Sequence, residues 1–291
     1  MTPPPYRLGL PMWGNKDWVG TLYAPRTRAA DFLEQYASVF SAVEGNTTFY
    51  SLPSAETVER WRAQTPEHFR FCFKLPKTIT HDRRLRDAGR ETAEFFGRME
   101  PLGERLGPFM IQLPASFGPE NLRVLAGYVE TLPSQFRFGV ELRHPTFYHN
   151  DEAFRAANGL LGVCGCERVM MDTSGMRAGD RGHPDVLAAE HKKPDLPIAP
   201  VVTTRDPMLR FVGHPEDAVN TPFFENWADQ LATWIAESRS PFVFMHCPNN
   251  AFAPAMAQRL HELLREKSPV VEELPEWPGV RHREPRQLDL L

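Results

Sequence analysis

The chain has 291 residues, of which 42% are hydrophobic and 20 are Phe, so it can form a large folded core and is not disordered along most of its length. Its formal net charge of −4 gives no general attraction to nucleic acid or anionic lipid, so nucleic acid is not an expected partner, although composition alone does not exclude it. No apolar run approaches the roughly 18 residues needed to cross a bilayer, and Met1–Tyr6 lacks a signal-peptide pattern, so we expect a cytoplasmic protein with no membrane partner.

Eight short β-type runs alternate with amphipathic helical stretches along the chain. In chain order, strands are expected at Tyr6–Met12, Phe40–Asn46, Arg70–Leu75, Pro108–Leu113, Phe136–Arg143, Val163–Asp172, Met208–Gly213 and Pro241–Cys247. Helices are expected at Ala29–Val39, Ser54–Thr65, Thr92–Leu106, Pro119–Leu132 and Thr221–Ser238. The repeat of about 33 residues is the size of one βα unit. This alternation predicts an α/β fold, a single (β/α)₈ barrel of the TIM type spanning residues 1–291.

Two segments fall outside this repeat. Ser174–Pro200 is long, polar and rich in Gly, Pro, Lys and Asp, a composition that favours a functional lid or a mobile loop. Ser268–Leu291 is proline-rich and charged, and we expect it to form a peripheral tail. The oligomeric state does not follow from either segment.

Polar side chains recur near the carboxyl ends of the predicted strands. Because side chains alternate along a strand, Phe71 and Phe73 share one face while Lys74 lies on the other, toward the barrel lumen. The same division assigns further polar residues to the lumen: Glu44, Asn46, Gln112, Glu141, Arg143, Asp172 and Arg210. Barrel enzymes have their active sites at this end of the strands. The alternative interpretation is a closed polar layer in which these charges only neutralise one another.

Four stretches carry a resemblance to a known family. They are FSAVEGNTTFYSLP (Phe40–Pro53), WRAQTPEHFRFCFKLPKTITHDRRL (Trp61–Leu85), QLPASFGP (Gln112–Pro119) and VELRHP (Val140–Pro145). With them the chain resembles the DUF72 or YecE-like proteins over about residues 6–265. The resemblance implies a TIM-barrel fold, but the biochemical role of that family is not established.

The resemblance also implies a set of site residues. The family's motif positions correspond here to Glu44, Asn46, Lys74, Gln112, Glu141, Arg143 and Asp172. Many members carry two asparagines after the last strand, where this chain has Asn249 and Asn250 following His246.

The first functional hypothesis is an enzyme, a hydrolase, lyase or isomerase, that acts on a small anionic substrate bearing phosphate or carboxylate. The candidate catalytic residues are Glu141, Asp172 and Lys74, which would exchange protons or stabilise charge. The candidate substrate-binding residues are Glu44, Asn46, His81, Gln112, Arg143, His144, Arg210, His246 and Asn249. His81 belongs to a cationic stretch, Lys74–Arg90, that forms either an anion-attracting rim or a solvated surface.

Two other hypotheses remain open. A divalent-metal phosphoesterase resembling the barrel nucleases would draw its ligands from Glu44, Glu141, Asp172, His144 and His246. A non-catalytic protein would keep the same site to bind a metabolite. Because histidines are few and cations many among the lumen candidates, we expect no metal and no cofactor.

Overall fold

The computed structural model describes residues 5–198 and 200–281, and this part of the chain contains eight β-strands. Each strand lies inside one of the eight predicted runs. The strands are β1 (Arg7–Gly9), β2 (Ala42–Gly45), β3 (Arg70–Phe73), β4 (Phe109–Gln112), β5 (Phe138–Glu141), β6 (Cys166–Asp172), β7 (Met208–Val212) and β8 (Phe242–His246).

All ladders between these strands are parallel, and they form two sheets. In the described residues, six strands pair in the order β1-β8-β7-β6-β5-β4, while β2 pairs with β3 in a separate sheet. A few isolated hydrogen bonds join the sheets at both edges. Glu44 N donates to Leu10 O at 3.0 Å on one side, and Gly107 N to Phe71 O at 2.9 Å and Leu75 N to Met110 O at 3.0 Å on the other. The fold is therefore α/β and barrel-like, but the continuous eight-stranded ladder that the sequence predicts is interrupted on both sides of the β2–β3 pair.

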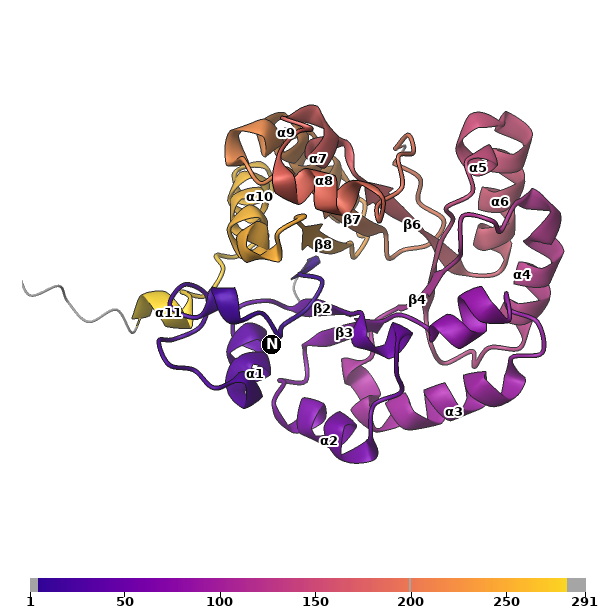
Figure 1. The fold of residues 1–291 in the computed structure, drawn as a ribbon, viewed down its shortest axis with the longest axis horizontal. Helices are drawn as coiled ribbons and strands as arrows, with labels where there is room; N and C mark the ends of the chain where they lie inside the picture. The colour runs from indigo at the N-terminus through magenta and orange to yellow at the C-terminus, as the bar shows by residue number, and fades with distance from the viewer. Residues whose placement is uncertain (1–4, 199, 282–291) are drawn as a thin grey trace, which may run out of the picture.

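Helices lie around the outside of the strands (Figure 1). They are α1 (Phe32–Ala37), α2 (Ala55–Ala63), α3 (Gly89–Met99), α4 (Leu122–Glu130), α5 (Thr146–His149), α6 (Asp151–Val163), α7 (Ser174–Ala178), α8 (Pro184–Glu190), α9 (Asp217–Ala236), α10 (Ala253–Lys267) and α11 (Pro278–Arg281). The five predicted helices correspond to α1, α2, α3, α4 and α9, whereas α6 and α10 were not predicted. These two cover strands, since α6 contacts β6 and α10 contacts β8. The shorter helices α5, α7, α8 and α11 were not predicted either.

The strands enclose a small apolar layer that is separate from the main core between strands and helices. Its members come from both sheets: Ala42, Cys72, Met110, Val169, Met208, Phe242 and Phe244. Gly139 is needed on β5, because a Cβ there would lie 2.4 Å from Met208 Sδ and 2.9 Å from Val169 Cγ2. We call the strand face that carries this layer the inner face. Residues whose side chains lie on this inner face meet one another at the two ends of the strands.

The segment predicted as a lid or mobile loop contains two short helices, α7 and α8, and is held by a hydrogen bond from the residue that follows β6 and by another within the segment itself. Thr173 Oγ1 donates to Pro194 O at 3.0 Å, and Arg177 Nη2 donates to Lys193 O at 3.0 Å. These bonds hold the chain around Lys193 in place.

The described part of the predicted tail packs against the start of the chain. Gly279 N donates to Leu22 O at 3.2 Å, and a Cβ at this glycine would lie 2.0 Å from Thr21 O. Residues 282–291 lie outside the described residues. Among the described helices, none combines the length and the apolar character that a bilayer span requires.

Candidate functional site

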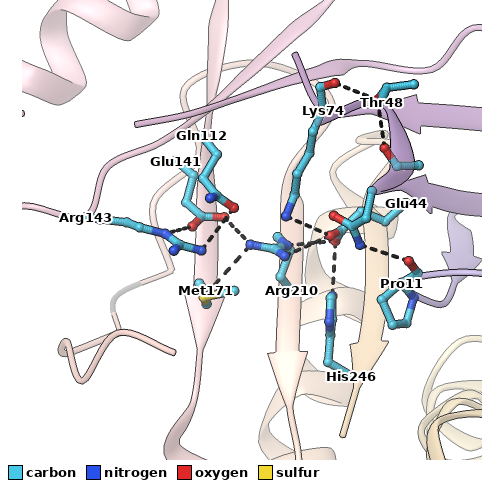
Figure 2. Close-up of polar contacts among 12 residues, drawn as sticks. Pro11, Glu44, Thr48, Lys74, Gln112, Glu141, Arg143, Met171, Arg210 and His246 are labelled. Atoms are coloured by element: carbon cyan, nitrogen blue, oxygen red, sulfur yellow. Dashed lines mark hydrogen bonds and ion pairs between the residues drawn. The ribbon is translucent and has the colours of Figure 1, made fainter. Parts of the chain in front are cut away.

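A buried chain of ion pairs joins β2, β5 and β7 at the carboxyl ends of the strands. Arg210 donates from Nε and Nη2 to the two carboxylate oxygens of Glu44, at 2.7 and 2.8 Å, and from Nη1 to Glu141 (Figure 2). All three side chains are at most 2% exposed. The planar guanidinium binds one carboxylate through two parallel bonds and a second through its remaining edge, so it fixes the positions of both.

Four more side chains extend this cluster from neighbouring strands (Figure 2). Arg143 donates from Nε to Glu141 and from Nη2 to Gln112 Oε1 at 3.0 Å. Lys74 Nζ lies 3.3 Å from Glu44 Oε1, and His246 Nε2 lies 3.1 Å from Glu44 Oε2. Because parallel strands end at the same edge of a sheet, residues far apart in sequence meet here.

The electrostatics of this cluster hold both glutamates in the charged form. Burial alone would raise the pKa of Glu44, but Arg210, Lys74 and His246 together bring it well below the usual range. Burial likewise raises the pKa of Glu141, and Arg143 and Arg210 outweigh it, so that this pKa is lowered to about 2. Both carboxylates are consequently anionic at neutral pH and weak as bases.

Two other groups of the cluster, His246 and Lys74, are shifted toward their neutral forms. Burial lowers the pKa of His246 to about 3 despite the nearby Glu44 carboxylate, so its imidazole is neutral at physiological pH. Burial and Arg210 lower the pKa of Lys74 to about 8, with Glu44 acting in the opposite direction. Lys74 therefore titrates close to neutrality, which an ordinary lysine does not.

Lys193 is a member of the site that the sequence analysis did not identify. It lies after α8, and its ammonium group interacts electrostatically with Glu44, Arg210, Lys74 and Arg143. Burial and Arg210 lower its pKa to about 7, with Glu44 opposing that change. The segment from Ser174 onward thus contributes a second lysine whose lowered pKa reflects burial and the charge of Arg210.

The sequence of this chain matches the family described as "Protein of unknown function DUF72" over residues 7–279. The curated UPF0759 protein YecE of Escherichia coli strain K12 is 39% identical over 272 residues, which cover 93% of this chain and 97% of that protein. The chain belongs to the DUF72 family.

Solved structures of DUF72 proteins have a similar fold. The protein from Enterococcus faecalis aligns with a TM-score of 0.69 at 21% identity, covering 98% of this chain and all of that one. The protein from Thermotoga maritima aligns with a TM-score of 0.67 at 23% identity, covering 89% of this chain and 99% of that one. At these identities the likeness concerns the fold alone.

Several residues predicted for the site of this DUF72 protein lie at its edge and make local contacts. Asn46 Nδ2 donates to Pro11 O at 2.9 Å, which ties β2 to the loop after β1. His144 Nδ1 accepts from Thr146 N at 3.2 Å, and Asn249 Oδ1 accepts from Ala251 N at 3.1 Å. These three side chains hold the loops that follow β1, β5 and β8, and no contact to the ion-pair chain is found for them among the described residues.

His81 lies nearer to the cluster, in the π-helical turn Thr78–Asp82 that follows β3. Its Nδ1 is 2.9 Å from Thr80 Oγ1, and its ring stands edge-on to Phe49 at a centroid distance of 5.1 Å. Burial and the positive charge of Arg143 lower its pKa. Single π-helical turns are often found at functional sites.

Asp172 does not lie in the lumen as the sequence analysis expected. Trp227 Nε1 on α9 donates to Asp172 Oδ2 at 2.7 Å, and Ser174 N donates to Oδ1 at 2.9 Å. The opposite face of β6 is the inner one, because Val169 belongs to the apolar layer and Met171 Sδ lies 3.9 Å from Arg210 Nη1. Asp172 thus joins β6 to the helical layer and is not available to the cluster.

The five side chains considered as metal ligands do not form a common ligand set. Glu44 contacts His246, but Glu141 is bound by two arginines and Asp172 faces Trp227. Within residues 5–198 and 200–281, no three His, Cys, Asp or Glu side chains are grouped so that they could hold a metal ion. The donor set therefore does not fit the phosphoesterase hypothesis.

Proposed function

We propose that this DUF72 protein is an enzyme that acts on a small carboxylated or phosphorylated substrate at the carboxyl ends of the strands. We also infer that its two sheets act as one closed barrel, since inner side chains from both sheets share the apolar layer under the cluster. The substrate would lie above Glu44 and Arg210, against the side chains that retain some exposure: Lys74, Gln112 and Arg143.

The charge balance of the cluster is the main observation that supports this proposal. Glu44 and Glu141 are matched by Arg210 and Arg143 through direct ion pairs. His246 is neutral, because burial lowers its pKa to about 3. When Lys74 and Lys193 are protonated, the cations of the cluster therefore outnumber its two carboxylates, although Lys74 lies 3.3 Å from Glu44 Oε1. An anion that binds beside them supplies the missing charge and accepts strong hydrogen bonds from Arg143 and the lysines.

The same lysines are the best candidates for proton transfer. Glu141 was expected to exchange protons, but two arginines hold its pKa at about 2, so it is better suited to orient Arg143 and Arg210. Lys193, with a pKa of about 7, and Lys74, with a pKa of about 8, are near the operating pH where general acids and bases are most effective. We therefore assign proton exchange with the substrate to Lys193 and Lys74, and substrate orientation to Arg143 and Gln112.

A test of this assignment begins with ligand discovery by thermal shift against small carboxylates and phosphate esters. A ligand at about 100 times its Kd stabilises the folded protein by about 2.7 kcal/mol. Ligands found in this way are then incubated with the protein in D₂O, and NMR follows the exchange of their carbon-bound protons. Lys193→Met should abolish the exchange, whereas Lys192→Met is the matched control, because Lys192 is its exposed neighbour.

Three outcomes separate the hypotheses. Exchange that depends on Lys193 but not on Lys192 supports an acid–base enzyme. Binding without exchange in any ligand supports the non-catalytic hypothesis instead. Exchange or turnover that survives Lys193→Met and Lys74→Met would contradict the role given to the lysines.

A further inference from the structure

A second charged site lies at the opposite end of the strands, at the amino-terminal mouth of the barrel-like fold. A cavity of about 520 Å³ opens there. Four arginines from separate segments line it: Arg7, Arg70, Arg137 and Arg239. Its single acidic lining residue among the described residues is Asp206. Residues two apart in a strand share a face, and Arg70 and Arg137 lie two residues before Cys72 and Gly139. Both arginines are therefore on the inner face.

Arg7 is the decisive residue of this cavity. It is 7% exposed, and its Nη1 atom is buried without a hydrogen-bond partner among the described residues. A buried guanidinium without a partner is destabilising, since a charge removed from water needs compensation. Burial, followed by the nearby charges of Arg70 and Arg137, lowers the pKa of Arg7 to about 10. Burial and the neighbouring arginines thus disfavour the positive charge that Arg7 carries.

The other arginines do not relieve this charge. Arg70 donates from Nη1 to the backbone oxygens of Glu67 and Phe69, at 2.7 and 3.0 Å, and forms no ion pair within the described residues. Arg137 already engages Asp206, from Nη1 to Oδ2 at 2.6 Å. Arg239 donates from Nε to Glu237 Oε2 at 2.9 Å, so Arg7 and Arg70 are the two lining arginines for which no ion pair is found among the described residues.

The walls of the cavity are mixed in character. Ser238 and Ser240 offer hydroxyl groups, while Ile235, Phe242 and Val270 are apolar. Arginine forks match phosphate oxygens through paired hydrogen bonds, and apolar walls suit the organic part of a phosphate ester. The size of the cavity lies within the usual range for small-molecule sites, about 300 to 1,000 Å³.

We propose that this mouth is a second ligand site, separate from the carboxyl-end cluster, and that it binds a small phosphate ester through Arg7 and Arg70. The bound phosphate supplies the negative charge that the Arg7 guanidinium lacks, since no ion pair is found for Arg7 among the described residues. The organic group of the ester lies against Ile235, Phe242 and Val270. An apolar layer that includes Cys72, Met208 and Phe244 separates this site from the carboxyl-end cluster.

Isoleucine methyl NMR of the full chain can test this proposal, because the isoleucines report on different ends of the strands. Ile235 lines the mouth, whereas Ile79 lies beside Thr80 in the π-helical turn after β3, at the other end. Inorganic phosphate and phenyl phosphate are titrated separately into the wild type, Arg7→Met and Arg155→Met. Arg155 is an exposed residue of α6, so its variant loses the same charge away from the cavity.

The expected result is a saturable shift of the Ile235 signal, with phenyl phosphate binding more tightly than inorganic phosphate. Arg7→Met should raise the midpoint of this titration about tenfold or more, and Arg155→Met should leave it unchanged. In phosphate-free buffer, Arg7→Met should also melt at a temperature no lower than the wild type, because it replaces an unpaired buried charge with an apolar side chain of similar length.

Other outcomes would overturn the proposal. An Ile235 signal that does not respond, or the same midpoint in Arg7→Met, removes the site. If phosphate shifts only the NMR signal of Ile79, it binds at the carboxyl-end cluster and not at the mouth. Equal affinity for the two probes contradicts the role of the apolar wall. A lower melting temperature of Arg7→Met together with an unchanged titration would make Arg7 a structural residue.

Discussion

Replacing Glu44 with Gln keeps the shape of the most connected side chain of the cluster and removes its charge. Glu44 is fully buried and contacts Arg210 at 2.7 and 2.8 Å, Lys74 at 3.3 Å and His246 at 3.1 Å. Removing one partner of a buried ion pair costs about 3 to 5 kcal/mol. Because Arg210 keeps its bond to Glu141, we expect the lower end of that range. If each kcal/mol moves Tm by about 2 to 4 °C, a loss of about 3 kcal/mol lowers Tm by roughly 6 to 12 °C.

The loss of stability in Glu44→Gln should depend on pH in a direction that follows from the pKa of Glu44. The pKa of Glu44 lies well below its ordinary value of 4.5 in the folded protein, since Arg210 and Lys74 outweigh the effect of burial. Its carboxylate therefore stabilises the fold fully above that ordinary value, and the contribution is lost as the pH falls toward the folded-state pKa. The difference between wild type and Glu44→Gln should be largest near neutrality and shrink in acid.

Calorimetry and urea unfolding across this pH range measure the effect. Glu273→Gln is the control, because Glu273 is 80% exposed and its ion pair with Arg265 at 3.4 Å should contribute almost nothing. A Glu44→Gln protein as stable as the wild type at neutral pH, or a difference that does not change with pH, would refute the reasoning.

Three further predictions concern the proposed site. Arg143→Ala should weaken anion binding by about 2 kcal/mol or more, and Arg143→Lys should also weaken it, whereas Arg281→Ala should not, as measured by calorimetric titration with a melting control for each variant. If Lys193 is the base, proton exchange should increase as the pH rises through its pKa of about 7, and NMR of Lys193→Met should show no such increase. Metal analysis of untreated protein should find well under one equivalent of zinc or manganese; stoichiometric metal bound through Glu141 or His246 would favour the phosphoesterase hypothesis.

The strands could be predicted from the sequence because alternation and the βα repeat are local signals. The inner-face assignment held for Glu44, Lys74, Gln112 and Arg210, each flanked by bulky residues that mark the opposite face. It failed for Asp172. In β6 the residues before Asp172 are Val, Met and Met, which are apolar on both faces of the strand, so the sequence does not show which face is the inner one. The packing of Val169 against the space over Gly139 determines the inner face.

Lys193 illustrates what a sequence pattern does not contain. It lies outside every strand, and its position depends on hydrogen bonds that the side chains of Thr173 and Arg177 donate to the backbone oxygens of Pro194 and Lys193. No local periodicity in the sequence predicts these bonds. The helix α10 is a different case, because its signal was present. Leu260 and Leu264 fall on one face at helical spacing, and Pro254 stands in the first turn, where proline is tolerated.

The alternative of a closed polar layer explains only part of the cluster. Glu44, Glu141, Arg143 and Arg210 balance one another and would serve stability alone. Lys74 and Lys193 have no such explanation, because burial and Arg210 lower the pKa of each, which means that folding disfavours their charged forms near neutrality. A protein with a formal charge of −4 thus places more cationic than anionic side chains at the carboxyl ends of its strands and in the lining of the opposite mouth, where Arg7 has no ion pair among the described residues. The net charge of the chain predicts no attraction to anions, whereas the placement of the individual charges predicts local attraction to anions at the two ends of the strands.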